Sequence, residues 1–359
     1  MIKNKRTLFI LILAIVALTL GACTGRRVSA TGWSGITVQE ETVYFSYGPH
    51  AYAVNLKNGA LLWQYPAEAE NGVDFYASPV FADNDSQLIV GSFNSVIYSI
   101  NPVNGLELWA FRGAENRYIA PPLVTEDGIY AASADNSLYA LDFDGLLRWK
   151  FETDDPLWAS PIWSENCGCI YQVSMDHNMY AIDPDNGKLL WKTEDLGGPI
   201  VSPPTISEDG LIIFSTFNNE VVALDETGHG VEWRYHTSDW AWASPVIDGE
   251  QVYASDIGGT FYALDLASGE VLWQLQPGGG IYSAPLVADG LIYFSTDASS
   301  LVVVSQDGVV QRNQPIEGKL YASPTAAENK LLLAPSEAEF FLVALNESGV
   351  QVWGYPPAK

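Results

Sequence analysis

The chain has 359 residues, and 43 Asp and Glu residues against 17 Lys and Arg residues give it a formal net charge of −26. A surface this acidic repels polyphosphates and anionic lipid head groups. The charge therefore argues against nucleic acid as a partner and against membrane binding through basic patches.

Residues 1–22 are typical of an export signal. Three basic residues lie near the start, an unbroken apolar stretch runs from Leu8 to Leu18, and small residues precede Cys23. This order describes a cleaved signal peptide rather than a membrane-spanning helix. We therefore predict an extracytoplasmic protein whose mature form begins at Cys23.

The residues around Cys23 suggest a lipid anchor. Leu20, Gly21 and Ala22 directly precede Cys23 and resemble the bacterial lipobox, in which the cysteine thiol is diacylated. The resemblance implies stable anchoring by acyl chains, with residues 23–32 as a tether and 33–357 as one folded domain. An ordinary secretory signal with an incidental cysteine is the alternative.

One pattern recurs eight times at intervals of about 41 residues, which indicates a repeat array. A small residue is followed by Asp or Asn two positions later, then by a turn with Gly, and four residues after the Gly by Trp. Seven copies keep the Trp, at Trp63, Trp109, Trp149, Trp191, Trp233, Trp273 and Trp353. The seventh copy has Arg312 at this position.

Each repeat predicts four β-strands. Residues 243–276 contain four short β-branched and aromatic runs separated by Asp-Gly and Ser-Gly turns, which are strand and hairpin signals. The predicted mature chain shows no amphipathic helical period. We therefore predict an all-β fold, an eight-bladed β-propeller of four-stranded antiparallel blades. The pattern does not say where the ring closes.

The repeated Trp is predicted to be structural. In a packed ring of sheets, an indole fills the gap between neighbours, and a small residue leaves room beside it. Arg312 cannot fill such a gap equally well. We therefore expect the seventh blade to be the loosest.

Cys167 and Cys169 flank Gly168. Outside the cytoplasm two thiols can oxidise, but a bridge across one residue closes a small, strained ring. The four histidines show no metal-ligand spacing. We expect a hairpin turn that carries two thiols and no metal site, with a functional cysteine pair as the alternative.

The repeat is similar to the tryptophan-docking repeat of the pyrroloquinoline-quinone (PQQ)-like propellers over nearly the whole mature chain. One branch contains quinoprotein dehydrogenases. The other is non-enzymatic and includes the outer-membrane assembly scaffold BamB family. The vicinal cysteine pair of the dehydrogenases is missing, because Gly168 separates Cys167 from Cys169, and no Cys-x-x-Cys-His motif occurs. We therefore expect neither PQQ nor calcium as a cofactor.

Candidate binding residues recur at two positions of the repeat. An aromatic residue stands three positions before a Pro in five repeats, at Tyr76, Trp158, Trp242, Tyr282 and Tyr321. The turn between the second and third strands carries Asp135, Asp176, Asp256 and Asp297. In a propeller both positions lie at one mouth of the channel, where aromatic rings beside carboxylates suit a cationic peptide, a sugar or a divalent ion. The alternative is structural, because Asp stabilises tight turns.

No nucleophile elbow, phosphate-binding loop or zinc-helix motif occurs, so we predict no catalytic residue and no enzyme. The sequence favours a lipid-anchored scaffold for protein partners, monomeric within a larger complex at the cell envelope. A glycan or small-ligand sensor is the alternative, and a PQQ-dependent dehydrogenase comes last.

Overall fold

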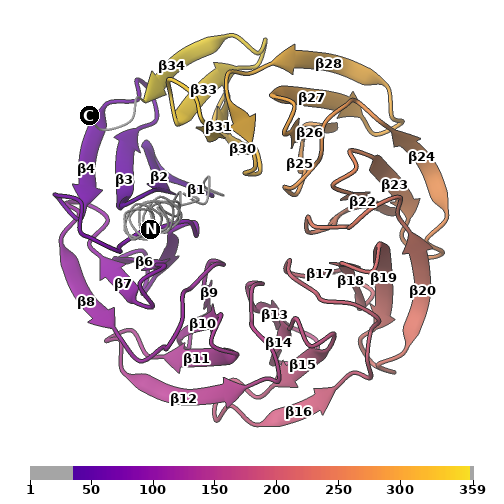
Figure 1. Cartoon of the computed structure of the whole chain (residues 1–359), viewed down its shortest axis with the longest axis horizontal. Helices are drawn as coiled ribbons and strands as arrows, with labels where there is room; N and C mark the ends of the chain where they lie inside the picture. The colour runs from indigo at the N-terminus through magenta and orange to yellow at the C-terminus, as the bar shows by residue number, and fades with distance from the viewer. Residues whose placement is uncertain (1–34, 356–359) are drawn as a thin grey trace, which may run out of the picture. The chain divides into compact units, whose positions relative to one another are not determined.

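The computed structural model describes residues 35–355; the predicted signal peptide, Cys23 and the whole predicted tether lie outside them. The described chain contains 34 strands and no helix, so no helix in this range is able to span a membrane. Eight four-stranded sheets form a ring around a central channel (Figure 1). The prediction of an all-β, eight-bladed propeller is confirmed.

The first four blades follow one another along the chain. Blade 1 contains β1 (Ile36–Gln39), β2 (Thr42–Tyr47), β3 (His50–Asn55) and β4 (Leu61–Tyr65). Blade 2 contains β5 (Val80–Ala82), β6 (Gln87–Gly91), β7 (Ile97–Ile100) and β8 (Glu107–Phe111). Blade 3 contains β9 (Leu123–Val124), β10 (Ile129–Ser133), β11 (Ser137–Leu141) and β12 (Leu147–Glu152). Blade 4 contains β13 (Ile162–Ser164), β14 (Cys169–Val173), β15 (Met179–Ile182) and β16 (Leu189–Lys192).

The last four blades continue this order. Blade 5 contains β17 (Thr205–Ile206), β18 (Leu211–Thr216), β19 (Glu220–Asp225) and β20 (Val231–His236). Blade 6 contains β21 (Val246–Asp248), β22 (Gln251–Ser255), β23 (Phe261–Asp265) and β24 (Val271–Leu275). Blade 7 contains β25 (Leu286–Ala288), β26 (Leu291–Thr296), β27 (Ser300–Ser305) and β28 (Val310–Pro315). Blade 8 contains β30 (Thr325–Ala327), β31 (Lys330–Leu333), β33 (Leu342–Asn346) and β34 (Gln351–Tyr355), and β29 (Lys319–Leu320) pairs separately with β32 (Pro335–Ser336).

Every blade is an antiparallel meander from the channel to the rim (Figure 1). Because the chain reverses at each hairpin, alternate connections lie on the same face of the ring. We call the side with the second-to-third turns and the connections between blades the loop face. The side with the first-to-second and third-to-fourth turns is the hairpin face.

The small residue and the Trp of each repeat are cross-strand partners. Ala181 on β15 lies opposite Trp191 on β16, and the register shifts immediately after Ala181. The same pairing and the same shift occur in all eight blades, with Val303 opposite Arg312 in blade 7. The small residue therefore makes room for the ring beside it.

The indoles fill the seams between neighbouring blades, as predicted. The ring of Trp149 packs on Gly187 of the next blade, whose φ is +70° and where an added Cβ would lie 2.6 Å from the indole. Its Nε1 donates to the carbonyl of Pro184 at 2.8 Å. Five further indoles make the same Gly contact and Nε1 bond, at Trp63, Trp109, Trp233, Trp273 and Trp353. The Trp and the Gly of one repeat thus serve two different seams.

Two seams depart from this rule. Trp191 stacks on His229, which takes the place of the Gly with a φ of +56°, and the ring centroids are 4.1 Å apart. At the seam of blades 7 and 8, the Nη2 of Arg312 donates to the carbonyl of Glu347 at 2.8 Å. At the six regular seams the carbonyl at this position of the turn accepts the hydrogen bond from the indole Nε1. Arg312 therefore makes the equivalent hydrogen bond across the seam without an indole ring.

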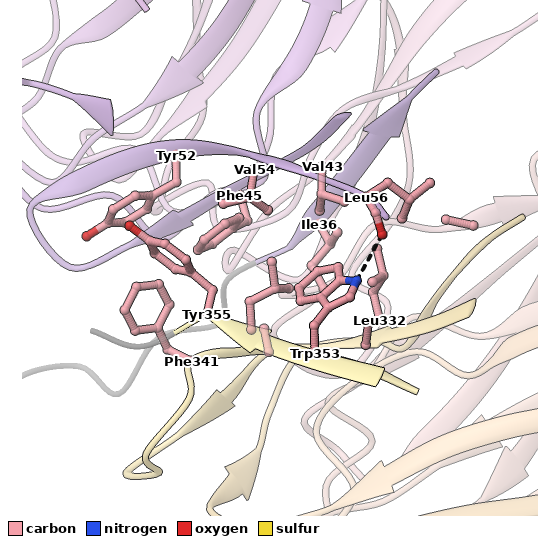
Figure 2. Packing of buried hydrophobic residues seen from close by; sticks show 14 of the residues in the cluster. Ile36, Val43, Phe45, Tyr52, Val54, Leu56, Leu332, Phe341, Trp353 and Tyr355 are labelled. Carbon is pink, nitrogen blue, oxygen red and sulfur yellow. Dashed lines mark hydrogen bonds between the residues drawn. The ribbon is translucent and has the colours of Figure 1, made fainter. Parts of the chain in front are cut away.

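The ring closes between blades 8 and 1 without an exchanged strand. Trp353 donates its Nε1 to the carbonyl of Leu56 at 2.9 Å, across 297 positions of sequence (Figure 2). A buried cluster that includes Phe45, Tyr52, Phe341 and Tyr355 joins the two blades (Figure 2). Each other seam has its own buried cluster, so the core is divided into eight.

Candidate functional site at the channel

The structure brings the five predicted aromatic residues together. Tyr76, Trp158, Trp242, Tyr282 and Tyr321 all line one cavity of about 320 Å³ in the central channel. The cavity receives residues from all eight blades, and none of those that line it is charged. A single position of the repeat thus becomes a ring of side chains, because the blades are related by rotation about the channel.

Four of the aromatic rings near the channel form a continuous arc over blades 5 to 8. Phe217 lies 4.9 Å from Trp242, Trp242 lies 6.3 Å from Tyr282, and Tyr282 lies 5.4 Å from Tyr321, between ring centroids. Burial, and then the charge of Asp297, raises the pKa of Tyr282. Across the channel, Tyr76 lies 4.2 Å from Phe93, and burial followed by Asp74 raises its pKa to about 12.

Two blades have two consecutive Pro residues, Pro121–Pro122 and Pro203–Pro204, and this shifts the count by one residue. Tyr118 and Ile200 also stand three residues before a Pro, yet both are completely buried. Tyr118 forms a β-bridge with Ser133, and its ring packs in the seam of blades 2 and 3. Counting three residues back from the second Pro gives Ile119 and Val201, and both of these line the cavity.

The four predicted carboxylates do not line the channel cavity. Asp135, Asp176, Asp256 and Asp297 all accept hydrogen bonds from neighbouring loops, and Asp256 accepts from the Thr260 amide at 2.9 Å and the Tyr262 hydroxyl at 2.6 Å. Asp256 has no exposed surface and therefore cannot contact a ligand. The same Tyr contact recurs at Asp135 and Asp176, which supports the structural alternative for these turns.

Sequence reasoning missed a larger hollow on the hairpin face. It encloses about 790 Å³ between blades 2, 3 and 4 and is lined by aromatic side chains and five carboxylates, at Asp83, Asp85, Glu126, Asp127 and Glu165. Asp83–Asp85 lie in the β5–β6 turn. Within residues 35–355, no group of three or more His, Cys, Asp or Glu side chains is arranged to hold a metal ion.

The sequence left the oxidation of Cys167 and Cys169 open and favoured two thiols, whereas in the structure the two sulfurs form a disulfide. The predicted hairpin turn between β13 and β14 is present, and the Gly168 amide donates to the Ser164 carbonyl at 2.9 Å. Gly168 has a φ of +61°, and the turn holds the two Cα atoms 5.1 Å apart, a spacing compatible with a bridge. The turn thus supplies the geometry that spacing alone argued against.

Comparison with known proteins decides the family. The family model of outer membrane protein assembly factor BamB matches residues 50–166, 144–239, 175–279 and 217–356, which together cover nearly the whole propeller. The chain belongs to the BamB family. The prediction of a PQQ-like repeat propeller of this type is confirmed.

Individual relatives are distant. The BamB of Moranella endobia is 26% identical over 272 residues, which cover 68% of this chain and 68% of that protein. A tetrathionate hydrolase of Acidithiobacillus ferrooxidans is 24% identical over 321 residues, which cover 75% of this chain but only 63% of the hydrolase. The match with the hydrolase therefore spans less than two thirds of its length.

A solved BamB structure has a similar fold. The crystal structure of BamB from Moraxella catarrhalis matches with a TM-score of 0.73 and 16% identity, covering 86% of this chain and 94% of that one. At this identity the likeness shows the fold alone. The partners and the chemistry of this BamB-family chain must therefore be argued from its own residues.

Proposed function

We propose that this protein is a non-catalytic scaffold of the cell envelope that binds other envelope proteins during outer membrane protein assembly. The match of residues 50–356 to the BamB family model carries the proposal. The predicted acylation of Cys23 would hold the propeller at a membrane, with the protein monomeric in a larger complex. Nucleic acid is not proposed as a partner, because the net charge is −26.

The loop face presents an anchor for a protein partner. Trp240 lies in the connection between β20 and β21 with 46% of its surface exposed, and its ring stacks on Phe217 at 5.2 Å. Exposed Trp residues on a rigid support are typical of the central contacts of interfaces. We therefore assign Trp240 and Phe217 to the partner surface.

The backbone around Trp240 is fixed before any partner binds. The Trp240 amide donates to the Asp239 carboxylate at 2.8 Å, and the Trp240 carbonyl accepts from the Ile257 amide at 3.0 Å. The Thr237 hydroxyl donates to the Asp239 carbonyl at 2.7 Å. A fixed loop loses little conformational freedom on binding, which favours affinity. The neighbouring carboxylate favours a partner surface with basic residues around an apolar centre.

Site-specific crosslinking in cells tests this proposal. A photo-crosslinking amino acid in place of Trp240 is expected to capture an envelope protein of the assembly machinery. The matched control replaces Asp144, an exposed residue in the β11–β12 turn on the hairpin face. Trp240→Ala in the otherwise native chain should weaken the captured complex about 30-fold. Equal capture at positions 240 and 144, or none at 240, would contradict the assignment.

The similarity to a tetrathionate hydrolase supplies the rival function. Incubation of the purified protein with tetrathionate, followed by measurement of its disappearance, separates the two. We expect no turnover. If the protein consumes tetrathionate, and the Trp240→Ala variant does so as well, the scaffold proposal is wrong and the protein is an enzyme.

A further inference from the structure

The seam between blades 7 and 8 has no aromatic ring at three positions where most other seams have one. Arg312 stands in place of the repeated Trp. The residue two positions later is Gln314, and the residue before the small residue of the third strand is Val343. At five other seams these last two positions hold a pair of rings, with centroids 5.3–5.7 Å apart. Only this seam therefore lacks all three rings.

A cavity of about 150 Å³ lies at this seam, and Gln314 and Val343 both line it. Its floor is apolar, because Ile316, Val343 and Leu345 line it and are buried. Exposed residues of β28, of β34 and of the connection after β28 also line it, and these strands form the rim of the ring (Figure 1). A side chain from outside can therefore enter. We call this cavity the seam groove.

A regular seam shows what such a surface holds. Leu345 and Gly349 line the seam groove. Their counterparts in blade 4, by position in the repeat, are Ile182 and Gly187. Ile182 belongs to the same buried cluster as Trp149, and Gly187 lies directly against the indole of Trp149. The lining of the seam groove thus matches the surface on which an indole packs elsewhere in the ring.

Arg312 places a positive charge next to the seam groove. Its Nη2 donates to the carbonyl of Glu347, and its Nη1 lies 3.5 Å from the Oε1 of Gln314. Among residues 35–355, no carboxylate forms an ion pair with this guanidinium. A guanidinium attracts the face of an aromatic ring. The charge therefore favours an aromatic occupant over an aliphatic one of similar size.

We infer that the seam groove is a docking site for one aromatic side chain of a protein partner. The size agrees, since an apolar cavity of about 150 Å³ holds one benzene ring. Aromatic side chains that fill a pocket are typical anchors of interfaces. The inference rests on the proposed function, because the partner is an envelope protein. It adds a contact at the rim to the one at Trp240 on the loop face.

Titration with small amides tests the chemistry of the seam groove. The whole protein in detergent is titrated with the N-acetyl amides of tryptophan, phenylalanine and leucine, and NMR signals of the Ile316, Val343 and Leu345 methyl groups locate the binding. The two aromatic amides should bind with a Kd of about 1–5 mM, and the leucine amide at least about three-fold more weakly. Equal binding of all three, no binding at about 20 mM, or shifts that spare these methyl groups overturn the inference.

Restoring a ring from this chain should close the seam groove. Arg312→Trp is expected to weaken binding of the aromatic amides at least about ten-fold, because its own indole then packs on Leu345 and Gly349. The matched control is Gln311→Trp, which adds the same ring at an exposed neighbour on the opposite side of β28 and should alter Kd by less than about two-fold. Gln314→Phe replaces Arg312→Trp if the latter does not fold. Unchanged binding in the folded variant overturns the inference.

Crosslinking in cells tests the partner. A photo-crosslinking amino acid in place of Glu317, an exposed residue that lines the seam groove, should capture an envelope protein through a peptide that contains Trp, Tyr or Phe. The capture should fall at least about five-fold when Arg312→Trp is also present. No capture, or capture that ignores Arg312→Trp, overturns the inference. Turnover of tetrathionate would contradict the scaffold while binding of the amides persists, so the two proposals fail separately.

Discussion

The blade seams and the channel mouth are built from the same repeat but use it in opposite ways. At six of the eight seams an indole packs on a Gly and donates to a turn carbonyl of the next blade. At the mouth, one repeat position faces the channel in blades 2 to 8, and its side chain varies, at Tyr76, Ile119, Trp158, Val201, Trp242, Tyr282 and Tyr321. Closing a ring imposes one geometry on every seam, whereas the mouth has no such constraint and can vary with a ligand or partner.

The two irregular seams show which part of the constraint is strict. Arg312 replaces the indole yet still donates to the carbonyl of Glu347, and His229 replaces the Gly yet keeps a positive φ. The hydrogen bond and the turn conformation survive where the ring or the Gly does not. Polar and backbone geometry therefore define the seam at least as firmly as the indole.

The largest effect is expected at a regular seam. Trp149→Ala removes a ring that is 9% exposed together with its bond to Pro184, and should lower the free energy of unfolding by about 3–5 kcal/mol. Urea unfolding at one pH measures this. An unchanged midpoint would mean that the indoles do not hold the ring together.

A smaller effect is expected at the seam of blades 7 and 8. Arg312→Ala should cost about 1–2 kcal/mol, because it removes the bond to Glu347 and the packing of the aliphatic stem. Arg312→Trp should instead raise the stability above that of the native chain by filling the seam. Blade 7 should also show the fastest hydrogen exchange in its strands β27 and β28. Protection equal to that of β23 and β24 would contradict the idea that this blade is the loosest.

The smallest stability effect is expected at the mouth. Trp158→Ala and Trp242→Ala should each change the free energy of unfolding by less than about 1 kcal/mol, because both rings are only half-buried and line a cavity. The same urea titration applies to the single and double variants. A loss as large as that for Trp149→Ala would erase the distinction between seam and mouth.

The candidate site was only partly predictable. Counting three residues back from the Pro found the five rings of the channel, and the same count from the second Pro of Pro121–Pro122 finds Ile119, which lines the cavity, and not the buried Tyr118. The turn between the second and third strands left a recognition role and a structural role open for Asp256, and the hydrogen bonds of this turn favour the structural role. The direction of the Asp side chain depends on the hydrogen-bond partners that neighbouring loops bring to it, and spacing in the sequence does not encode these partners.

The sequence by itself determined the all-β class, the number of blades and the position of the docking Trp residues. These features follow from local periodicity, because strands, Asp-Gly turns and small residues opposite a ring are set by near neighbours in the chain. The tertiary structure alone decided which Gly supports which indole, where Trp353 closes the ring, that Cys167 and Cys169 are bonded, and that uncharged side chains converge on the channel. The disulfide depends on the backbone conformation of one turn, and the other features depend on the rotation that brings distant blades together, which is a property of the closed ring and not of any single repeat.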